Sequence, residues 1–313
     1  MEEITIPTSK SGNLLTLLNK NQSKIEKIFN VPISLRGDKI MFEGDIKTRK
    51  LLKKFINSLI KIEEISPSFN GNDLKIGLNM VKDGNIDLLE TELLQSQKIL
   101  INGKSVFPKT LNQKKYIRAA FENDLTFAIG PAGTGKTFIA VAIALHHLLY
   151  KKLERIVLTR PVVEAGEKLG FLPGDIQQKV NPYFRPLYDS LYSLIGFEKT
   201  SELIEKEIIE VAPLAYMRGR TINDAFIILD EGQNTTNSQM QMFLTRFGSN
   251  SRVIVTADIT QIDLDDKKKS GIFRAKKILE KIEGIKIAYL KEKDVIRHHL
   301  VRKIIKAYEK EKE

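Results

Sequence analysis

Hydrophobic residues follow a repeating order from about residue 112 to the end of this 313-residue chain. Short apolar runs alternate with longer segments in which apolar residues recur every three or four positions. A short run predicts a strand covered on both faces, and the longer spacing predicts a helix. We expect strands at 125–129, 155–159, 225–229, 252–256 and 285–290, and helices at roughly 112–122, 135–150, 236–247, 270–282 and 294–310. The alternation predicts an α/β domain, in which helices cover both faces of a parallel sheet.

The first hundred residues have a different pattern. Helical spacing occurs at 13–29, 46–60 and, more weakly, 74–97, and two short alternating strands are expected at 32–36 and 39–43. We therefore predict a small α+β domain over residues 1–100. The segment 101–110 contains Asn-Gly and Pro, which are typical of a linker, and the second domain is expected to span 101–313.

The order of helices and strands in the first domain resembles a KH-type RNA-binding module. KH modules clamp RNA with a Gly-x-x-Gly loop, and the first hundred residues contain no such sequence. A docking or oligomerisation module of similar shape accounts for the pattern equally well. Both interpretations stay open at the level of the sequence.

Residues 166–221 form an unusually long stretch between predicted strands. It contains an aromatic cluster, Tyr183, Phe184, Tyr188 and Tyr192. A long insertion beside a nucleotide-binding core usually carries contacts to substrates or partners. We therefore expect this stretch to serve recognition rather than core packing.

Composition limits the protein class. The chain has no cysteine, which excludes disulfides and thiolate metal sites and agrees with a reducing cytoplasm. It has no run of 18 apolar residues and starts without an apolar signal core, so we expect a cytoplasmic protein without a membrane partner. The net charge of +11 favours a polyanion as partner. It does so only slightly, because lysine-rich charge is usually spread over solvated faces.

One glycine-rich octapeptide carries the strongest chemical signal in the chain. Its residues are Gly130, Pro131, Ala132, Gly133, Thr134, Gly135, Lys136 and Thr137. Glycines let backbone N–H groups surround a phosphate, Lys136 adds a charge for the β- and γ-phosphates, and the Thr137 hydroxyl can bind Mg²⁺. An apolar strand is predicted before this loop and a helix after it, and the helix N-terminus favours an anion. The octapeptide predicts a phosphate-binding loop.

Two further strand ends complete the predicted site. Asp230 and Glu231 follow an apolar strand, where Asp230 can hold Mg²⁺ through water and Glu231 can act as a general base. Gln261 follows another strand and can bond both a phosphate oxygen and the attacking water. Carboxyl ends of parallel strands meet at one edge of the sheet, so we expect these side chains near the loop. The carboxylate pair favours hydrolysis over binding alone.

A glutamine at the start of a predicted helix indicates which base is bound. Gln113 can pair with N6 and N7 of adenine through two hydrogen bonds if it lies beside the phosphate loop. The guanine-reading sequence Asn-Lys-x-Asp does not occur in the chain. We therefore predict ATP and Mg²⁺ as the cofactors.

These motifs, taken together and in order, resemble the PhoH-like ATPase family, which is related to superfamily 1 helicases. The matching stretches are 108–110, 112–113, 130–137, 158–161, 164–175, 217–221, 229–231, 243–246, 256–264 and 294–298. The resemblance implies a RecA-like P-loop NTPase core and a role in RNA metabolism, with RNA and a separate ribonuclease as partners. It also implies that Arg160 lies in a segment that contacts single-stranded nucleic acid.

A helicase motor normally completes its ATP site with an arginine from a second RecA-like domain, and this chain has one such core. A neighbouring subunit could supply that arginine, so we expect a homo-oligomer such as a ring. The candidates are Arg218, Arg220, Arg246 and Arg297. An ATP-gated adaptor for a protein partner and a DNA-directed motor are the rival functions, with a kinase ranked last.

Overall fold

The computed structural model describes residues 2–7, 12–66, 69–95, 98–150, 152–162 and 176–297, together with 300, 301, 304 and 307. Contacts divide the chain into two compact units. The first comprises Met1–Ser96 with Phe107–Leu111, and the second comprises Gln97–Val106 with Asn112–Glu313. Among the described residues no helix is both long enough and apolar enough to cross a membrane.

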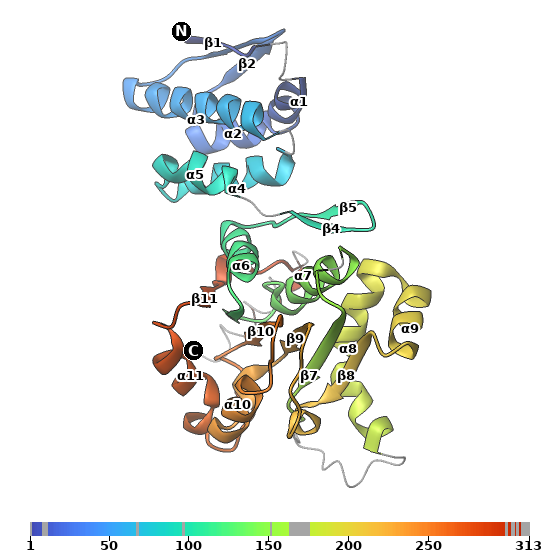
Figure 1. Ribbon diagram of the computed structural model, residues 1–313. Coiled ribbons are helices and arrows are strands. Elements are labelled where there is room, and N and C mark those ends of the chain that lie inside the picture. The colour runs from blue at the N-terminus through green and yellow to red at the C-terminus, as the bar shows by residue number, and fades with distance from the viewer. Residues whose placement is uncertain are drawn as a thin grey trace. The chain divides into compact units, whose positions relative to one another are not determined.

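The first unit is an α+β domain built on a three-stranded antiparallel sheet (Figure 1). Its sheet order is β1 (Glu2–Thr5), β3 (Lys39–Phe42), β2 (Ile33–Arg36), and its helices are α1 (Gly12–Lys20), α2 (Gln22–Phe29), α3 (Ile46–Ile65), α4 (Gly71–Lys82) and α5 (Leu89–Leu94). The expected α+β class is confirmed. Strand β1 was not predicted, because four residues at a chain end carry too little periodicity to stand out.

The helix predicted at 13–29 is two helices in the structure. Asn21 separates α1 from α2 with φ −119° and ψ 12°, outside helical values. Its side-chain amide donates to the carbonyl of Leu17 (2.8 Å). Asparagine competes for backbone groups in this way, which is why it favours turns over helix interiors. The apolar spacing continues across the break because both helices bury their stripe in one core.

Capping explains where the later helices of this unit begin. Asp45 accepts a hydrogen bond from the Thr48 backbone N–H (2.9 Å) at the start of α3. Asn70 and Asp73 form a reciprocal capping box at the start of α4. Each cap satisfies backbone donors that lack a partner within the helix. The weakly helical stretch 74–97 thus contains most of α4, a short 3₁₀ turn and α5.

The second unit contains a sheet of six parallel strands, which confirms the α/β prediction (Figure 1). The sheet order is β11 (Ile285–Tyr289), β6 (Leu125–Ile129), β10 (Arg252–Ala257), β9 (Ala225–Leu229), β7 (Arg155–Arg160) and β8 (Ile209–Pro213). All five predicted strands are present. Strand β10 lies between β6 and β9, so the phosphate loop and the Asp-Glu pair follow strands that are not neighbours.

Helices cover both faces of this sheet, as Figure 1 shows. One face packs against α6 (Leu111–Glu122), α7 (Lys136–Leu149), α8 (Ile176–Ile195) and α9 (Phe197–Glu205), and the other against α10 (Asn237–Leu244) and α11 (Gly271–Leu279). Alternate strand residues belong to the two cores, because successive side chains point to opposite faces. Ile228 lies in the first core and Ile227 in the second. The hairpin of β4 (Ile99–Ile101) and β5 (Lys104–Val106) replaces part of the expected linker and also packs against α7.

The expectation that residues 166–221 serve recognition rather than packing is wrong for their described part. Helices α8 and α9 and strand β8 lie in this stretch and belong to the fold's core. Phe184, Leu187 and Leu191 are buried on one helical stripe of α8. Pro182 and Pro186 lie inside the helix and hid its pattern, because proline normally ends a helix. Residues 163–175, including the family stretch 164–175, lie outside the described residues.

Candidate nucleotide-binding site

The phosphate loop joins β6 to α7, and its glycines are needed for two different reasons. Gly133 and Gly135 have φ values of 81° and 82°, in the left-handed region that glycine adopts without strain. Gly130 is needed for space instead. A Cβ at this position would lie 2.6 Å from the backbone oxygen of Leu290, which follows strand β11. Positive φ values therefore require glycine at positions 133 and 135, and the close approach of the edge strand requires it at position 130.

The side chain of Lys136 folds back onto the phosphate loop. Its Nζ donates to the carbonyl oxygens of Gly130 (2.7 Å) and Pro131 (3.0 Å). Burial lowers the pKa of Lys136, and the nearby carboxylates, Asp258 first among them, oppose this shift. A desolvated ammonium group bonded only to neutral carbonyls in the described residues fits a site for an anionic ligand.

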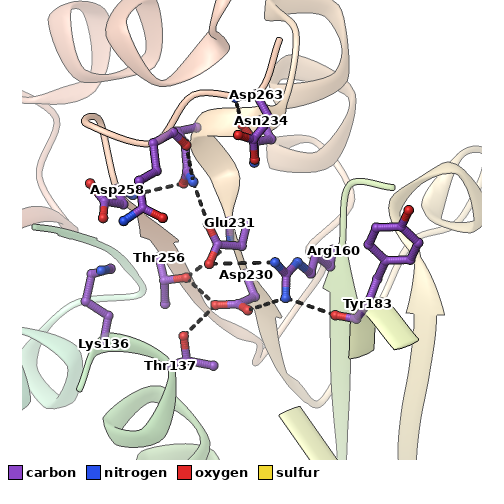
Figure 2. Close-up of polar contacts among 12 residues, drawn as sticks. Lys136, Thr137, Arg160, Tyr183, Asp230, Glu231, Asn234, Thr256, Asp258 and Asp263 are labelled. Carbon is purple, nitrogen blue, oxygen red and sulfur yellow. Dashed lines mark hydrogen bonds and ion pairs between the residues drawn. The ribbon is translucent and has the colours of Figure 1, made fainter. Parts of the chain in front are cut away.

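The next feature is a contact between the loop and the carboxylate pair. Thr137 Oγ1 and Thr256 Oγ1 both donate to Asp230 Oδ1, at 2.7 and 2.6 Å (Figure 2). Asp230 is almost fully buried, at 1% exposed. A hydroxyl and a carboxylate in contact are the hard oxygen donors that Mg²⁺ prefers, and Mg²⁺ needs few of them because it keeps most of its waters. Thr137 and Asp230 therefore fit a magnesium ion.

Glu231 sits directly beside this position in an unusual backbone conformation. Its φ is 54°, in the left-handed region that few non-glycine residues adopt. Burial raises the pKa of Glu231, and the neighbouring charge of Asp230 raises it further, whereas Gln233, Arg160 and Lys136 lower it. A desolvated carboxylate with a raised pKa has the properties of a general base.

Arg160 faces both carboxylates from the end of β7. Its guanidinium lies 3.8 Å from an oxygen of Asp230 and 3.8 Å from an oxygen of Glu231 (Figure 2). It also donates to the backbone oxygen of Tyr183 in α8 (2.9 Å). The side chain is only 20% exposed, so the structure places it against the carboxylates rather than on an open surface. The expected contact with nucleic acid stays a prediction.

The loop after β10 contains Asp258 and the predicted site residue Gln261. Asp258 is buried, and its Oδ1 accepts hydrogen bonds from the backbone N–H (3.0 Å) and hydroxyl (2.6 Å) of Thr260. Its Oδ2 is buried without a hydrogen-bond partner in the described part of the chain. Gln261 lies in the same loop with an exposed side chain. Its proposed contact with a phosphate oxygen stays a prediction.

Gln113 lies beside the phosphate loop, where the adenine prediction requires it. Its Nε2 donates to the carbonyl oxygen of Thr134 (2.9 Å), and only 3% of the residue is exposed. The same nitrogen would lie 3.3 Å from a Cβ added to Gly135. The amide thus supports the loop, and whether it also reads adenine stays a prediction.

Gln233 is a site residue that sequence reasoning missed. It is fully buried, and its Nε2 donates to the carboxylate of Glu231 and to the backbone oxygen of Gln261 (3.0 Å). Its Oε1 accepts from the backbone N–H of Asp258 (2.9 Å). The one available signal is a glutamine two residues after the Asp-Glu pair.

Arg297 lies on its own phosphate loop. Its Nη2 donates to the carbonyl oxygen of Ala132 (3.1 Å), and the preceding backbone N–H of Ile296 donates to Gly133 (2.9 Å). The family stretch 294–298 therefore contacts the loop within one chain, and His298 lies outside the described residues.

Comparisons with known proteins identify the family of this chain. The family model described as "PhoH-like protein" matches residues 105–309. The "PhoH-like protein" of Bacillus subtilis (strain 168) is 46% identical over 287 residues, covering 92% of this chain and 90% of the relative. "Protein PhoH" of Escherichia coli (strain K12) is 46% identical over 198 residues, 63% of this chain and 56% of the relative.

A solved structure, "Sulfolobus solfataricus SWI2/SNF2 ATPase core in complex with dsDNA", aligns with 51% of this chain and 34% of its own length. The identity is 15% and the TM-score 0.33, too distant to bear on fold or function. The family model matches most of the chain, and the Bacillus subtilis relative aligns along nearly its whole length. With its P-loop fold of the nucleotide-hydrolysing type, this chain belongs to the PhoH-like protein family.

Proposed function

We propose that this protein is a Mg²⁺-dependent ATPase that acts in RNA metabolism. The observation that carries the proposal is the contact of Thr137 with Asp230, which places a magnesium-binding pair beside the desolvated carboxylate of Glu231. A protein that only binds nucleotide has no need of a second, partly buried carboxylate at this position.

Each side chain has a distinct part in the proposed reaction. Lys136 would exchange its two carbonyl partners for phosphate oxygens, and Thr137 and Asp230 would hold the metal ion. Glu231 accepts the proton of the attacking water, which its raised pKa allows. When bound, Mg²⁺-ATP supplies the phosphoanhydride bond and a metal charge that neutralises the phosphate oxygens.

ATP turnover measured with and without Mg²⁺ tests the proposal on three proteins: wild type, Lys136→Ala and Glu231→Gln. We expect Lys136→Ala to lose nucleotide binding and Glu231→Gln to bind ATP but lose about 10²-fold or more in turnover. Lys206→Ala, which removes an exposed lysine paired with Glu202, is the matched control. Equal turnover in wild type and Glu231→Gln would overturn the proposal.

The RNA part of the proposal is supported by the net charge of +11 and by the family resemblance. Turnover should rise with added single-stranded RNA, and competition against single-stranded DNA over a salt series should show a preference for RNA. A preference for DNA would favour a DNA-directed motor, and no preference would indicate binding through phosphates alone. The lack of cysteine in the sequence supports a cytoplasmic location.

An ATP-gated adaptor, for example for a ribonuclease, is the second candidate. Hydrogen bonds connect Glu231 through the buried Gln233 to the loop at 258–261. They favour the adaptor, because a change at the nucleotide could alter the conformation of this loop. Full biological function in Glu231→Gln would support the adaptor, and loss of function with retained ATP binding would support the ATPase.

A homo-oligomer such as a ring would supply an arginine in trans from a neighbouring subunit. Three of the four candidates have partners within the chain: Arg220 pairs with Glu210, Arg246 donates to the carbonyl of Arg220, and Arg297 contacts Ala132. Arg218 is exposed, and its guanidinium has no partner among the described residues. We therefore propose Arg218 as the arginine that reaches a neighbouring site.

A further inference from the structure

The side-chain amide of Gln233 makes three hydrogen bonds within the site, and both of its donors are used. An amide offers two N–H donors and one carbonyl oxygen. Here the donors reach the carboxylate of Glu231 and the backbone oxygen of Gln261, and the oxygen accepts from the backbone N–H of Asp258. Gln233 is 0% exposed, so water cannot replace any of these bonds.

The backbone around Gln233 is also held in place. Its carbonyl oxygen accepts a 2.5 Å hydrogen bond from the hydroxyl of Ser270, the residue that precedes α11. The residue lies in a 3₁₀ turn, Gly232–Asn234, that directly follows the carboxylate pair. A Cβ at Gly232 would lie 2.7 Å from Val255 Cγ1 in β10, so the turn packs tightly against that strand. The hydrogen bond from Ser270 and the packing of the turn against β10 therefore help to fix the position of the Gln233 amide.

The same turn holds the loop after β10 at a second point. Asn234 donates to the carboxylate of Asp263 (3.1 Å) and accepts from its backbone N–H (2.9 Å). Figure 2 shows this pair above the carboxylates of Asp230 and Glu231. Asn234 and Gln233 both tether the loop, but only Gln233 also contacts the base.

We propose that Gln233 is a positioning residue that couples Glu231 to the loop at 258–261, so that a change in either alters the other. The inference rests on the proposed ATPase function for its meaning. The physical link, two bonds to the loop and one to the base from a single planar amide, does not depend on turnover. Because the amide is planar and buried, it cannot follow a shift of the loop without rotating its donor away from Glu231.

A double-mutant cycle of amide hydrogen exchange tests the coupling without using activity. The rate of amide hydrogen exchange across residues 257–262 is measured in wild type, Gln233→Leu, Glu231→Ala and the double variant. Each single variant should speed exchange by about 3-fold or more, and the double variant should exchange no faster than Gln233→Leu alone. Additive effects of the two substitutions would overturn the coupling.

Asn234→Leu is the matched control for a residue that tethers the loop without touching the base. It should speed exchange across the same peptide, and its effect should add to that of Glu231→Ala. Non-additivity equal to that of Gln233→Leu would mean that general loosening, and not the Gln233 amide, links the two, and would overturn the proposal.

Kinetics supply the second readout. Gln233→Leu should lower kcat by about 10- to 100-fold, as removal of a supporting hydrogen bond does, and change KM by less than about 3-fold. Gln233→Glu keeps the acceptor for the Asp258 N–H but removes the donors to both Glu231 and the Gln261 backbone oxygen, so it should speed loop exchange and also lose kcat. A change in KM with kcat intact would assign Gln233 to nucleotide binding and overturn the proposal.

The two ideas fail in different ways. Absence of Mg²⁺-dependent turnover in wild type would remove the proposed function, while the exchange cycle still reports whether Gln233 links Glu231 to the loop. Normal turnover with an additive exchange cycle would remove the coupling alone. Thermal melting of each variant shows whether it is folded, and Gln233→Met, which is uncharged and similar in length to glutamine, replaces Gln233→Leu if the latter is not.

Discussion

Thr137 and Asp230 lie 93 positions apart in the chain, yet the Thr137 hydroxyl donates a 2.7 Å hydrogen bond to Asp230 Oδ1. This bond joins the phosphate loop to the end of β9 across the intervening strand β10. Thr256, at the end of β10, donates to the same oxygen and completes the link. The two halves of the proposed magnesium site are thus in direct contact.

Asp230→Asn should raise the Mg²⁺ concentration needed for half-maximal turnover by about 10-fold or more, because the variant lacks the charge that attracts the ion. The amide oxygen can still accept from Thr137, so the fold should be retained. A Mg²⁺ titration of turnover measures the effect. Asp189→Asn, which changes an exposed carboxylate on α8, should leave the titration unchanged.

The pH dependence of turnover should report Glu231. Burial and the charge of Asp230 raise the pKa of Glu231, so the base becomes protonated, and turnover falls, at a higher pH than for an exposed glutamate. Arg160 favours the charged form, so Arg160→Met should raise that pKa further and move the acidic limb to higher pH. Turnover at about pH 6 relative to about pH 8 should therefore be lower in Arg160→Met than in wild type. An unchanged ratio would mean that Glu231 is not the titrating base.

Gly130→Ala should destabilise the second unit by about 1–3 kcal/mol through overpacking, and should weaken nucleotide binding as well. The added Cβ would lie 2.6 Å from the Leu290 oxygen and 2.8 Å from its Cβ, and backbone cannot move away cheaply. Thermal melting and fluorescent-nucleotide binding measure the two effects. Gly196→Ala, with φ 82°, ψ 166° and no atom within 4 Å of the added Cβ, should cost about 1–3 kcal/mol of backbone strain and leave binding intact.

Glu63→Gln should stabilise the first unit at neutral pH. Burial raises the pKa of Glu63, and one of its oxygens has no hydrogen-bond partner among the described residues, while the other accepts from the Leu14 backbone N–H (2.8 Å). The folded unit thus binds this proton more tightly than the unfolded chain does. Its contribution to stability is present below the unfolded pKa and is lost as pH rises through the folded pKa.

The neutral amide removes that loss, so the free energy of unfolding at about pH 7 should rise by about 1 kcal/mol or less, and by much less at about pH 4. The melting temperature of the first unit at the two pH values measures the effect. Glu64→Gln changes the exposed neighbouring carboxylate and serves as the control. A gain at both pH values would point to a cause other than the charge of Glu63.

Mixing two inactive variants tests the arginine in trans. Lys136→Ala lacks a functional loop but retains Arg218, and Arg218→Ala retains the loop but lacks the arginine. If Arg218 acts on a neighbouring subunit, an equal mixture should recover about a quarter of the wild-type rate through mixed interfaces. No recovery, with subunit exchange verified, would exclude Arg218. Arg185→Ala, an exposed arginine on α8, should be as active as wild type on its own.

Local patterns were sufficient for much of this molecule. The five predicted strands lie where apolar runs predicted them, because a strand buried on both faces can be read from consecutive residues. The conformation of the phosphate loop follows from its glycines, two of which have positive φ. Helix α8 was missed because its buried stripe is interrupted by Pro182 and Pro186, and its stability comes from packing against α7 and the sheet.

The nucleotide loop, the carboxylate pair and the α/β class of the second unit were thus encoded in short stretches of residues, since backbone conformation and burial depend on near neighbours. The roles of Gln233 and Arg297 depend on which strand ends lie side by side. Gln233 meets Asp258 only because β10 lies next to β9, and Arg297 meets Ala132 only because β11 pairs with β6. Strand order is decided by the packing of the whole sheet, and no short segment contains that information.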